Sequence, residues 1–395
     1  MRSNAVPGPW LRLAALAGAA ATLLAVVSGT WGPGTTHSLL SALALPPLLA
    51  VALAAWFSYR RLLPASVAAL ALFGAAAAVT VPGAHVALAA LAFAASIVVC
   101  ALCFRGEAVE TGPWRDYATL TKPRIMSLLL VTGAAGMFVG AGGVPPLGLF
   151  AGAMVGLALA CGGASALNHL LDRDIDRLMG KRTEKRPVAA GRMLPARALE
   201  FGLVLSALSF VLLASTVNVV TAVLALVGNL FYVLVYTAWL KRTTAQNIVI
   251  GGAAGAVPPL VGYAAATGDL GLPALWLFLI VFLWTPPHFW ALALLIKENY
   301  AAAKVPMLPV VRGDEETTRQ IVLYSVVMVG FTLAVGFSLG AIYSVAAALL
   351  GGVFLGLAWR LRQVPSRRNA GVLFHYSLLY LALLFVAAAV DPVIL

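Results

Sequence analysis

The chain has 395 residues, of which 62% are hydrophobic and only 10% are charged, and its mean hydropathy is +0.97. Soluble domains carry about 25% charged residues, so this composition excludes an ordinary soluble protein. The formal net charge of +12 does not require a nucleic-acid partner, because attraction to anionic lipid headgroups accounts for a basic membrane protein. We therefore expect a lipid bilayer as the partner phase and no nucleic acid.

Apolar segments of 17 residues or more recur along the whole chain. A helix rises about 1.5 Å per residue, so segments of this length can cross a hydrocarbon core of about 30 Å. Their length and continuous apolar character favour helices over barrel strands, and predict an all-α polytopic membrane protein. Thirteen spans are expected: Leu13–Gly29, Ser38–Phe57, Pro64–Thr80, Val86–Phe104, Ile125–Gly142, Leu147–Leu167, Leu199–Ser215, Val219–Leu240, Ile248–Ala266, Leu272–Ile296, Ile321–Gly340, Tyr343–Trp359 and Gly371–Val390.

The basic residues predict the orientation of these spans. With a cytoplasmic N-terminus, thirteen crossings leave all 26 Lys and Arg residues in the inner segments. Loops with an excess of Lys and Arg stay on the cytoplasmic side. We expect a multi-pass protein of the cell (inner or plasma) membrane, with its N-terminus inside and its C-terminus outside.

The polar segment 105–124 separates four spans from nine. The first 104 residues contain no acidic side chain, whereas the remainder carries almost all the groups capable of chemistry. We expect a four-helix transmembrane accessory region at 1–104, a cytoplasmic linker at 105–116 and a nine-helix domain at 117–395.

The stretch NHLLDRDIDRLMGKRTEKRP (168–187) concentrates three aspartates and six basic residues. Asn168, Asp172 and Asp176 are spaced i, i+4, i+8, so they share an arc of about 80° on one helical face, and Asp174 points elsewhere. Such oxygen ligands suit Mg²⁺, and the neighbouring cations suit a diphosphate. The alternative is a helix end whose acids and bases only pair with one another.

A second region, from Phe282 to Gly313, follows the expected tenth span. Two adjacent prolines, Pro286 and Pro287, are expected to break the helix and open space beside His288. An imidazole at membrane depth is costly without a role, although a hydrogen bond to a neighbouring helix would also explain it. The sequence further places Glu298 and Asn299 where they could face Asp172 as metal ligands.

Five motifs resemble the UbiA superfamily of intramembrane prenyltransferases and, within it, the protohaem IX farnesyltransferase (haem O synthase) family. The resemblance begins near Tyr117 and continues to the C-terminus. The motifs are YATLTKPRI (117–125), NHLLDRDID (168–176), KRPVAAGRM (185–193), WTPPHFWALA (284–293) and VPMLPVV (305–311).

The resemblance implies transfer of a farnesyl group from farnesyl diphosphate to a vinyl group of haem B, giving haem O for haem-copper terminal oxidases. It implies Mg²⁺ as cofactor, and haem A synthase or oxidase assembly proteins as possible partners. Asn168, Asp172 and Asp176 are the expected catalytic and metal-binding residues, joined at the metal by Glu298 and Asn299. The expected diphosphate ligands are Lys122, Arg124, Lys181, Arg182, Lys185, Arg186 and Lys241. The expected acceptor-binding residues are Trp284, His288 and Tyr300.

Two departures from the family pattern stand out. Asn299 occupies a position where the resemblance leads us to expect a carboxylate, and the family does not normally carry a region like 1–104. Two other functions are considered. One is a superfamily prenyltransferase acting on an aromatic quinone precursor; the other is a secondary transporter, which would need charges near the midplane of paired repeats. Here the charges lie at the cytoplasmic ends of the spans, where we also expect the active site to open.

Overall fold

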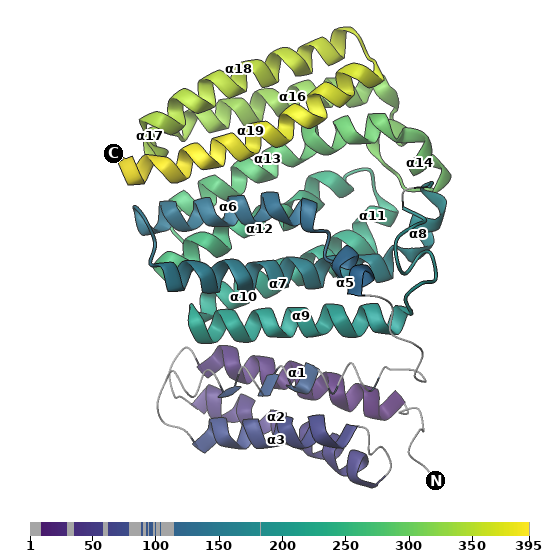
Figure 1. Cartoon of the computed structure of the whole chain (residues 1–395), viewed down its shortest axis with the longest axis vertical. Coiled ribbons are helices and arrows are strands. Elements are labelled where there is room, and N and C mark those ends of the chain that lie inside the picture. The colour runs from purple at the N-terminus through teal and green to yellow at the C-terminus, as the bar shows by residue number, and fades with distance from the viewer. Residues whose placement is uncertain are drawn as a thin grey trace.

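The structure of the chain is a computed structural model. It describes residues 9–29, 35–57, 62–78, scattered positions from 88 to 103, 114–181 and 183–394. Every regular element in these residues is helical (Figure 1). Nine of the described helices are long and apolar enough to cross a membrane. They are α6 (Pro123–Ala141), α7 (Leu147–Leu171), α9 (Pro195–Thr216), α10 and its continuation (Val219–Thr243), α12 (Asn247–Thr267), α13 (Leu272–Leu295), α16 (Gly313–Ala334), α18 (Ala341–Gln363) and α19 (Arg367–Ile394).

These nine helices match the nine spans predicted after residue 117, one for one. The connection between α16 and α18 is short, because α17 (Gly336–Leu339) leads through Gly340 directly into α18. Gly340 has φ 109°, a conformation that favours glycine. The prediction of a polytopic helical bundle is therefore confirmed.

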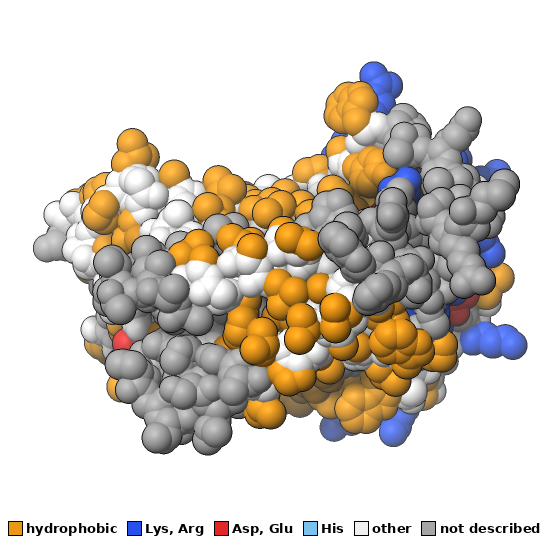
Figure 2. Space-filling view, turned by 90° about the horizontal axis from the view of Figure 1, so that it is seen from below, with side chains coloured by type: hydrophobic (Ala, Val, Ile, Leu, Met, Phe, Trp, Pro, Cys, Tyr) orange, Lys and Arg blue, Asp and Glu red, His pale blue; other side chains and the backbone are white. Residues whose placement is uncertain are grey.

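Short helices gather at one end of the bundle. Figure 1 places α5 (Trp114–Leu120), α8 (Arg173–Leu178), α11 (Lys241–Thr243) and α14 (Lys297–Ala302) together, while α17 lies at the opposite end. In the face seen in Figure 2, hydrophobic side chains cover the middle, and Lys and Arg collect toward the end that carries the short helices. This distribution is the one expected of a membrane protein with a basic inner end.

Glycines let the helices of the bundle approach closely. A Cβ atom added to Gly262 of α12 would lie 1.8 Å from the carbonyl oxygen of Gly133, and one added to Gly136 of α6 would lie 2.2 Å from that of Pro259. The backbones of α6 and α12 therefore touch directly. Small residues at helix contacts are the usual solution in lipid, where apolar side chains gain little by leaving the surrounding acyl chains.

The first part of the chain contributes three described helices, α1 (Pro9–Gly29), α2 (Thr35–Phe57) and α3 (Leu63–Ala78), drawn in purple in Figure 1. Only scattered positions of the expected fourth span, 86–104, and the last residues of the expected linker are among the described residues, so the proposed four-helix region stays a prediction. The ring of Phe93 packs against Phe210 of α9, with ring centroids 5.2 Å apart.

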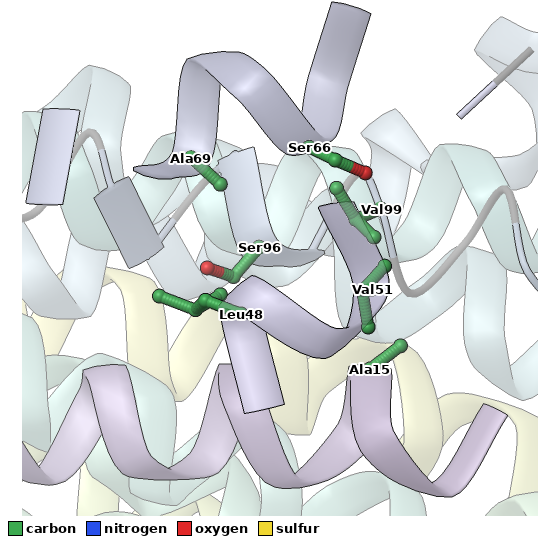
Figure 3. Close-up of a pocket in the computed structure, with 7 residues that line it drawn as sticks. All are labelled: Ala15, Leu48, Val51, Ser66, Ala69, Ser96 and Val99. Atoms are coloured by element: carbon green, nitrogen blue, oxygen red, sulfur yellow. The ribbon is translucent and has the colours of Figure 1, made fainter. Parts of the chain in front are cut away.

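A small cavity lies among these first helices (Figure 3). Its two polar side chains, Ser66 and Ser96, donate their hydroxyl hydrogens to Leu62 and Ala92 of their own helices, both at 2.8 Å. The described cavity wall therefore offers no charged group. The seven residues that line it are Ala15, Leu48, Val51, Ser66, Ala69, Ser96 and Val99.

Candidate active site

The three predicted oxygen-bearing residues lie together where the C-terminal end of α7 leads into α8. The backbone N–H of Asp172 donates to Asn168 at 2.9 Å, and that of Asp176 donates to Asp172 at 2.8 Å. Helical hydrogen bonding thus continues from α7 into α8, and the i, i+4, i+8 spacing places all three on one face. Asn168, Asp172 and Asp176 are 3%, 0% and 1% exposed. The amide of Asn168 also donates to Asp172 Oδ2 at 2.9 Å.

Three of the predicted diphosphate ligands contact this face. Lys122 donates to Asn168 Oδ1 at 2.6 Å, Lys241 to Asp172 Oδ2 at 2.5 Å and Arg186 to Asp176 Oδ1 at 2.6 Å. They come from the start of α6, from α11 and from the loop after α8. Three segments far apart in the sequence therefore deliver one cation each to one cluster of oxygens.

Lys122 has an unusual backbone and an unusual side-chain environment. Its φ of 49° and ψ of 59° lie in the left-handed region, which non-glycine residues adopt rarely and often at functional sites. Burial, with the positive charges of Arg186 and Lys241, lowers the pKa of Lys122 to about 7. Its ammonium group therefore titrates near neutral pH.

The other predicted diphosphate ligands are placed differently. Arg124, Lys181 and Lys185 are exposed, so they lie at the rim and not in the buried cluster. Arg182 lies outside the described residues.

Two carboxylate oxygens of the cluster are left over. Asp172 Oδ1 and Asp176 Oδ2 are buried and have no hydrogen-bond partner in the described structure. Burial raises the pKa of Asp176, and the positive charge of Arg186 opposes that shift. Buried polar atoms in native proteins nearly always have partners. Two free carboxylate oxygens beside the Asn168 amide fit a hard divalent cation such as Mg²⁺.

Asp174 points away from the cluster, as predicted. It is exposed and forms a bidentate ion pair with Arg242, whose Nη1 and Nη2 donate to Oδ2 and Oδ1 at 2.7 and 2.8 Å. The Arg242 hydrogen bond holds the pKa of Asp174 well below its usual range. Acid–base pairing, the alternative considered for this stretch, thus describes Asp174 well.

One wall of the site was not found from the sequence. The segment Phe231–Leu240, which continues α10, is a π-helix. Its Thr237 hydroxyl accepts from Asn168 Nδ2 at 3.1 Å, and the rings of Tyr232 and Tyr236 stack 5.6 Å apart. Such turns are frequent at functional sites. In the sequence, this wall could have been found from the four-residue spacing of Tyr232 and Tyr236 and of Thr237 and Lys241, which places each pair on one side of a helix.

His169, next to Asn168, was also missed. It is 2% exposed, and neither ring nitrogen has a hydrogen-bond partner among the described residues. The adjacent Asn168 belongs to the oxygen cluster and accepts from Lys122. A polar ring that is buried, without a described partner and adjacent to the cluster belongs to the site.

The expected break in α13 is absent. The helix runs without interruption from Leu272 to Leu295, through Pro286 and Pro287, so the prediction was wrong. In the most apolar 18-residue stretch of α13, 61% is buried inside the protein, the highest share among the nine spans found in the described residues. Packing against neighbouring helices holds the α13 backbone where two missing N–H groups would weaken an isolated helix.

His288 is 6% exposed and lies between aromatic side chains. Its ring lies between those of Trp284 and Phe374, with centroids 4.2 and 4.9 Å away. The Ser377 hydroxyl donates to Phe374 O at 2.6 Å, so its oxygen accepts from His288 Nδ1, also at 2.6 Å. The hydrogen therefore lies on Nδ1 and Nε2 keeps its lone pair.

The second region (282–313) contacts the stretch 168–187 through the side chain of Asn299. Its amide donates to the Met179 carbonyl, just after α8. Glu298 is exposed, and Tyr300 is 7% exposed in an apolar cluster with Ile175. The metal-binding role of Glu298 and Asn299, and the acceptor-binding role of Tyr300, stay predictions.

The model of the UbiA prenyltransferase family matches residues 129–386. The chain belongs to the UbiA prenyltransferase family. This family member is 53% identical over 281 residues to a Symbiobacterium thermophilum protein named protoheme IX farnesyltransferase, a match that covers 70% of this chain and 94% of that one. A Gloeobacter violaceus protein of the same name is 53% identical over 285 residues, covering 71% and 92%.

Solved structures show the same fold for this UbiA family member. A digeranylgeranylglyceryl phosphate synthase superposes with a TM-score of 0.60 and 18% identity, covering 71% of this chain and 99% of the other. A UbiA homolog from Archaeoglobus fulgidus bound to GPP and Mg²⁺ gives a TM-score of 0.54 and 17% identity, covering 69% and 99%.

Proposed function

We propose that this UbiA family member transfers the farnesyl group of farnesyl diphosphate to a vinyl group of haem B and so makes haem O. The observation that carries the proposal is the 53% identity to proteins named protoheme IX farnesyltransferase over nearly their whole length. The buried acidic cluster with its three cations supports it, because its chemistry suits a metal-bound diphosphate.

Asn168, Asp172 and Asp176 are the proposed Mg²⁺ ligands, and Glu298 and Asn299 are candidates for further ligands. The metal, when bound, neutralises negative charge on the diphosphate. Lys122, Lys241 and Arg186 would hold the same group from three sides. Negative charge grows on the diphosphate as the allylic carbon–oxygen bond breaks, so cations already in position stabilise the transition state more than the ground state.

Water must stay away from the allylic cation until the acceptor captures it. Tyr232 and Tyr236 form a stacked apolar wall beside the cluster, and the surrounding helices exclude solvent. We propose Trp284, His288 and Tyr300 as acceptor-binding residues, with His288 Nε2 as a hydrogen-bond acceptor or ligand.

The proposed site opens to the cytoplasm. It lies at the basic end of the bundle, and the positive-inside rule assigns that end to the inner face. The product would leave for haem A synthase or an oxidase assembly protein, the proposed downstream partners.

Haem analysis tests the proposal. Haems would be extracted from membranes of a bacterium that lacks its own haem O synthase and identified by mass spectrometry. Three strains would be compared: one without the chain, one with the unaltered chain and one with Asp172→Ala. Haem O is expected only with the unaltered chain. Membranes with unchanged haem and a newly prenylated aromatic quinone precursor would instead establish the alternative prenyltransferase.

A further inference from the structure

The turn between α18 and α19 forms a cleft whose lining includes no residue of the candidate active site. It has a volume of about 80 Å³, and it lies at the end of the bundle that also carries α8 and α14 (Figure 1). Its lining combines two arginines and an asparagine with two apolar side chains: Leu357, Arg360, Arg368, Asn369 and Val372.

The arginines at this turn fall into two groups. Arg362 pairs with Glu315 at 3.2 Å, and Arg367 donates to the Leu295 carbonyl at 2.8 Å. The side chains of Arg360 and Arg368, the two that line the cleft, are exposed and have no hydrogen-bond or ion-pair partner within the part of the chain the structure describes. Two guanidinium groups without an internal partner, on opposite sides of one cleft, attract an anion and suit phosphate oxygens in particular.

Neighbouring side chains give the depth of the cleft in the bilayer. Trp359, beside Arg360, is 56% exposed, and tryptophan is enriched at the membrane–water interface. Val353 and Val372 are 51% and 47% exposed on the same two helices, as lipid-facing residues are. The cleft therefore opens at headgroup level, with apolar surface directly beneath it.

We propose that this cleft binds the phosphate of an anionic phospholipid of the inner leaflet. Arg360 and Arg368 hold the phosphate, and the acyl chains follow the exposed apolar surface of α18 and α19. A lipid fits better than free phosphate because Leu357 and Val372 form an apolar side of the cleft that a small anion would leave uncovered.

Native mass spectrometry of the full chain tests this site. The protein would be released from nanodiscs holding equal phosphatidylglycerol and phosphatidylcholine, and the lipid retained would be counted. The double variant Arg360→Gln/Arg368→Gln is expected to retain about tenfold less phosphatidylglycerol, and Arg362→Gln, whose guanidinium is already paired, about as much as the unaltered chain.

Three results would overturn the proposal. They are equal retention by the double variant, equal retention of both lipids by the unaltered chain, and displacement of phosphatidylglycerol by millimolar inorganic phosphate. Farnesyl transfer is not part of the readout, so the outcome is independent of the proposed function.

A different observation, the unpartnered imidazole of His169, carries a second inference. One helical turn earlier, Ser165 donates to the Leu120 carbonyl at 2.6 Å, so this face of α7 looks toward the corner between α5 and α6. Lys122 extends from that corner to Asn168. His169 therefore lies on α7 beside Asn168 and faces the corner from which Lys122 extends, next to the place that the proposed diphosphate would enter.

We propose that His169 donates a ring N–H to an oxygen of the diphosphate. The inference rests on the proposed function, which supplies the ligand. A buried N–H without a partner among the described residues gains a full hydrogen bond from such an anion. Arg186 and Lys241 already bind carboxylates, and Lys122 binds the amide oxygen of Asn168.

Calorimetric titration of the full chain with inorganic pyrophosphate and Mg²⁺ tests this contact. His169→Phe is expected to weaken binding about tenfold, and His169→Gln, which keeps an N–H donor, to restore most of it. The KM for haem B should not change in either variant. Equal pyrophosphate affinity in His169→Phe and the unaltered chain would overturn the inference, and would leave the proposed reaction untouched.

Discussion

The C-terminal end of α7 and the middle of α13 both place polar side chains in an apolar bundle, but their polar atoms are partnered differently. Where α7 leads into α8, Asp172 Oδ1, Asp176 Oδ2 and both nitrogens of His169 are buried and have no partner among the described residues. At α13, Trp284 Nε1 and His288 Nδ1 are both bound by a single residue of α19, Ser377, although Trp290 Nε1 has no partner among the described residues.

This difference distinguishes a ligand-binding site, at the end of α7, from a structural contact between helices, at α13. Leaving a buried polar atom unpartnered costs about 1–3 kcal/mol, so several together indicate that a ligand completes the arrangement. A histidine stacked between two rings and bonded to the next helix instead fixes two helices relative to each other. The α7 end is organised for a ligand, and α13 supplies rigidity beside it.

Removing the carboxylates should produce the largest effect. We expect Asp172→Ala and Asp176→Ala each to reduce farnesyl transfer to haem B by about 10²-fold or more, because charge stabilisation at the leaving group is lost. Asp174→Ala is the matched control, since its exposed pair with Arg242 contributes at most about 1 kcal/mol. Near-normal transfer by either first variant, with the protein still in the membrane, would contradict the metal-site assignment.

His288→Ala tests whether α13 does more than support the site. We expect it to lose haem binding while it still binds a non-reactive farnesyl diphosphate analogue, because His288 belongs to the proposed acceptor side. Absorption titration with haem B and calorimetry with the analogue give the two readouts. Loss of analogue binding with haem binding intact would reverse the assignment.

Ser377→Ala tests the support itself. It removes the acceptor of the His288 N–H, so we expect a loss of about 1–3 kcal/mol in the free energy of unfolding. Ser325→Ala is the control, because that buried hydroxyl only bonds Ile321 of its own helix and its removal should cost less. Thermal unfolding in detergent compares the two; equal melting temperatures would show that the contact does not hold α13 to α19.

The pH dependence of diphosphate binding should reflect Lys122. Its pKa is lowered to about 7, so the ammonium form is present below pH 7 and is lost as the pH rises through that value. Affinity for the farnesyl diphosphate analogue should therefore fall by about tenfold between pH 6 and pH 8.5. Lys122→Arg keeps its charge throughout, so its affinity should change much less. The same decline in both proteins would exclude Lys122 as the cause.

Substitutions at Glu298 and Asn299, in the second region, should have the smallest effect on activity. If this region supplies a metal ligand, Asn299→Asp lowers the Mg²⁺ concentration needed for half-maximal activity a few-fold, and Glu298→Gln raises it. The hydrogen bond from Asn299 to Met179, which Asp could not donate, works against the first change. A flat Mg²⁺ response in both variants would confine the metal site to the stretch 168–187.

Much of this arrangement was predictable from local sequence. Nine apolar segments gave nine spans, and the i, i+4, i+8 spacing of Asn168, Asp172 and Asp176 gave the buried face because helix periodicity is a local property. The unbroken α13 was not predictable in the same way. Proline weakens an isolated helix, and only the enclosing helices, which the sequence does not order in space, keep this one straight.

The missed residues have the same cause. Thr237 of the π-helical segment contacts Asn168 across the bundle, and His169 becomes significant only once the fold buries it without a described partner beside the cluster. The sequence identified which residues carry charge, and the tertiary structure decided which of them remain unpartnered.

The central claim is that the free oxygens of Asp172 and Asp176 bind Mg²⁺ together with a prenyl diphosphate. Calorimetric titration of the full chain with farnesyl thiodiphosphate, with Mg²⁺ or with EDTA, tests it directly. We expect strong binding only with Mg²⁺, a loss of about tenfold or more in the isosteric variant Asp172→Asn, and unchanged binding in Asp174→Asn. Equal binding with Mg²⁺ and with EDTA, or unweakened binding by Asp172→Asn, would contradict the claim.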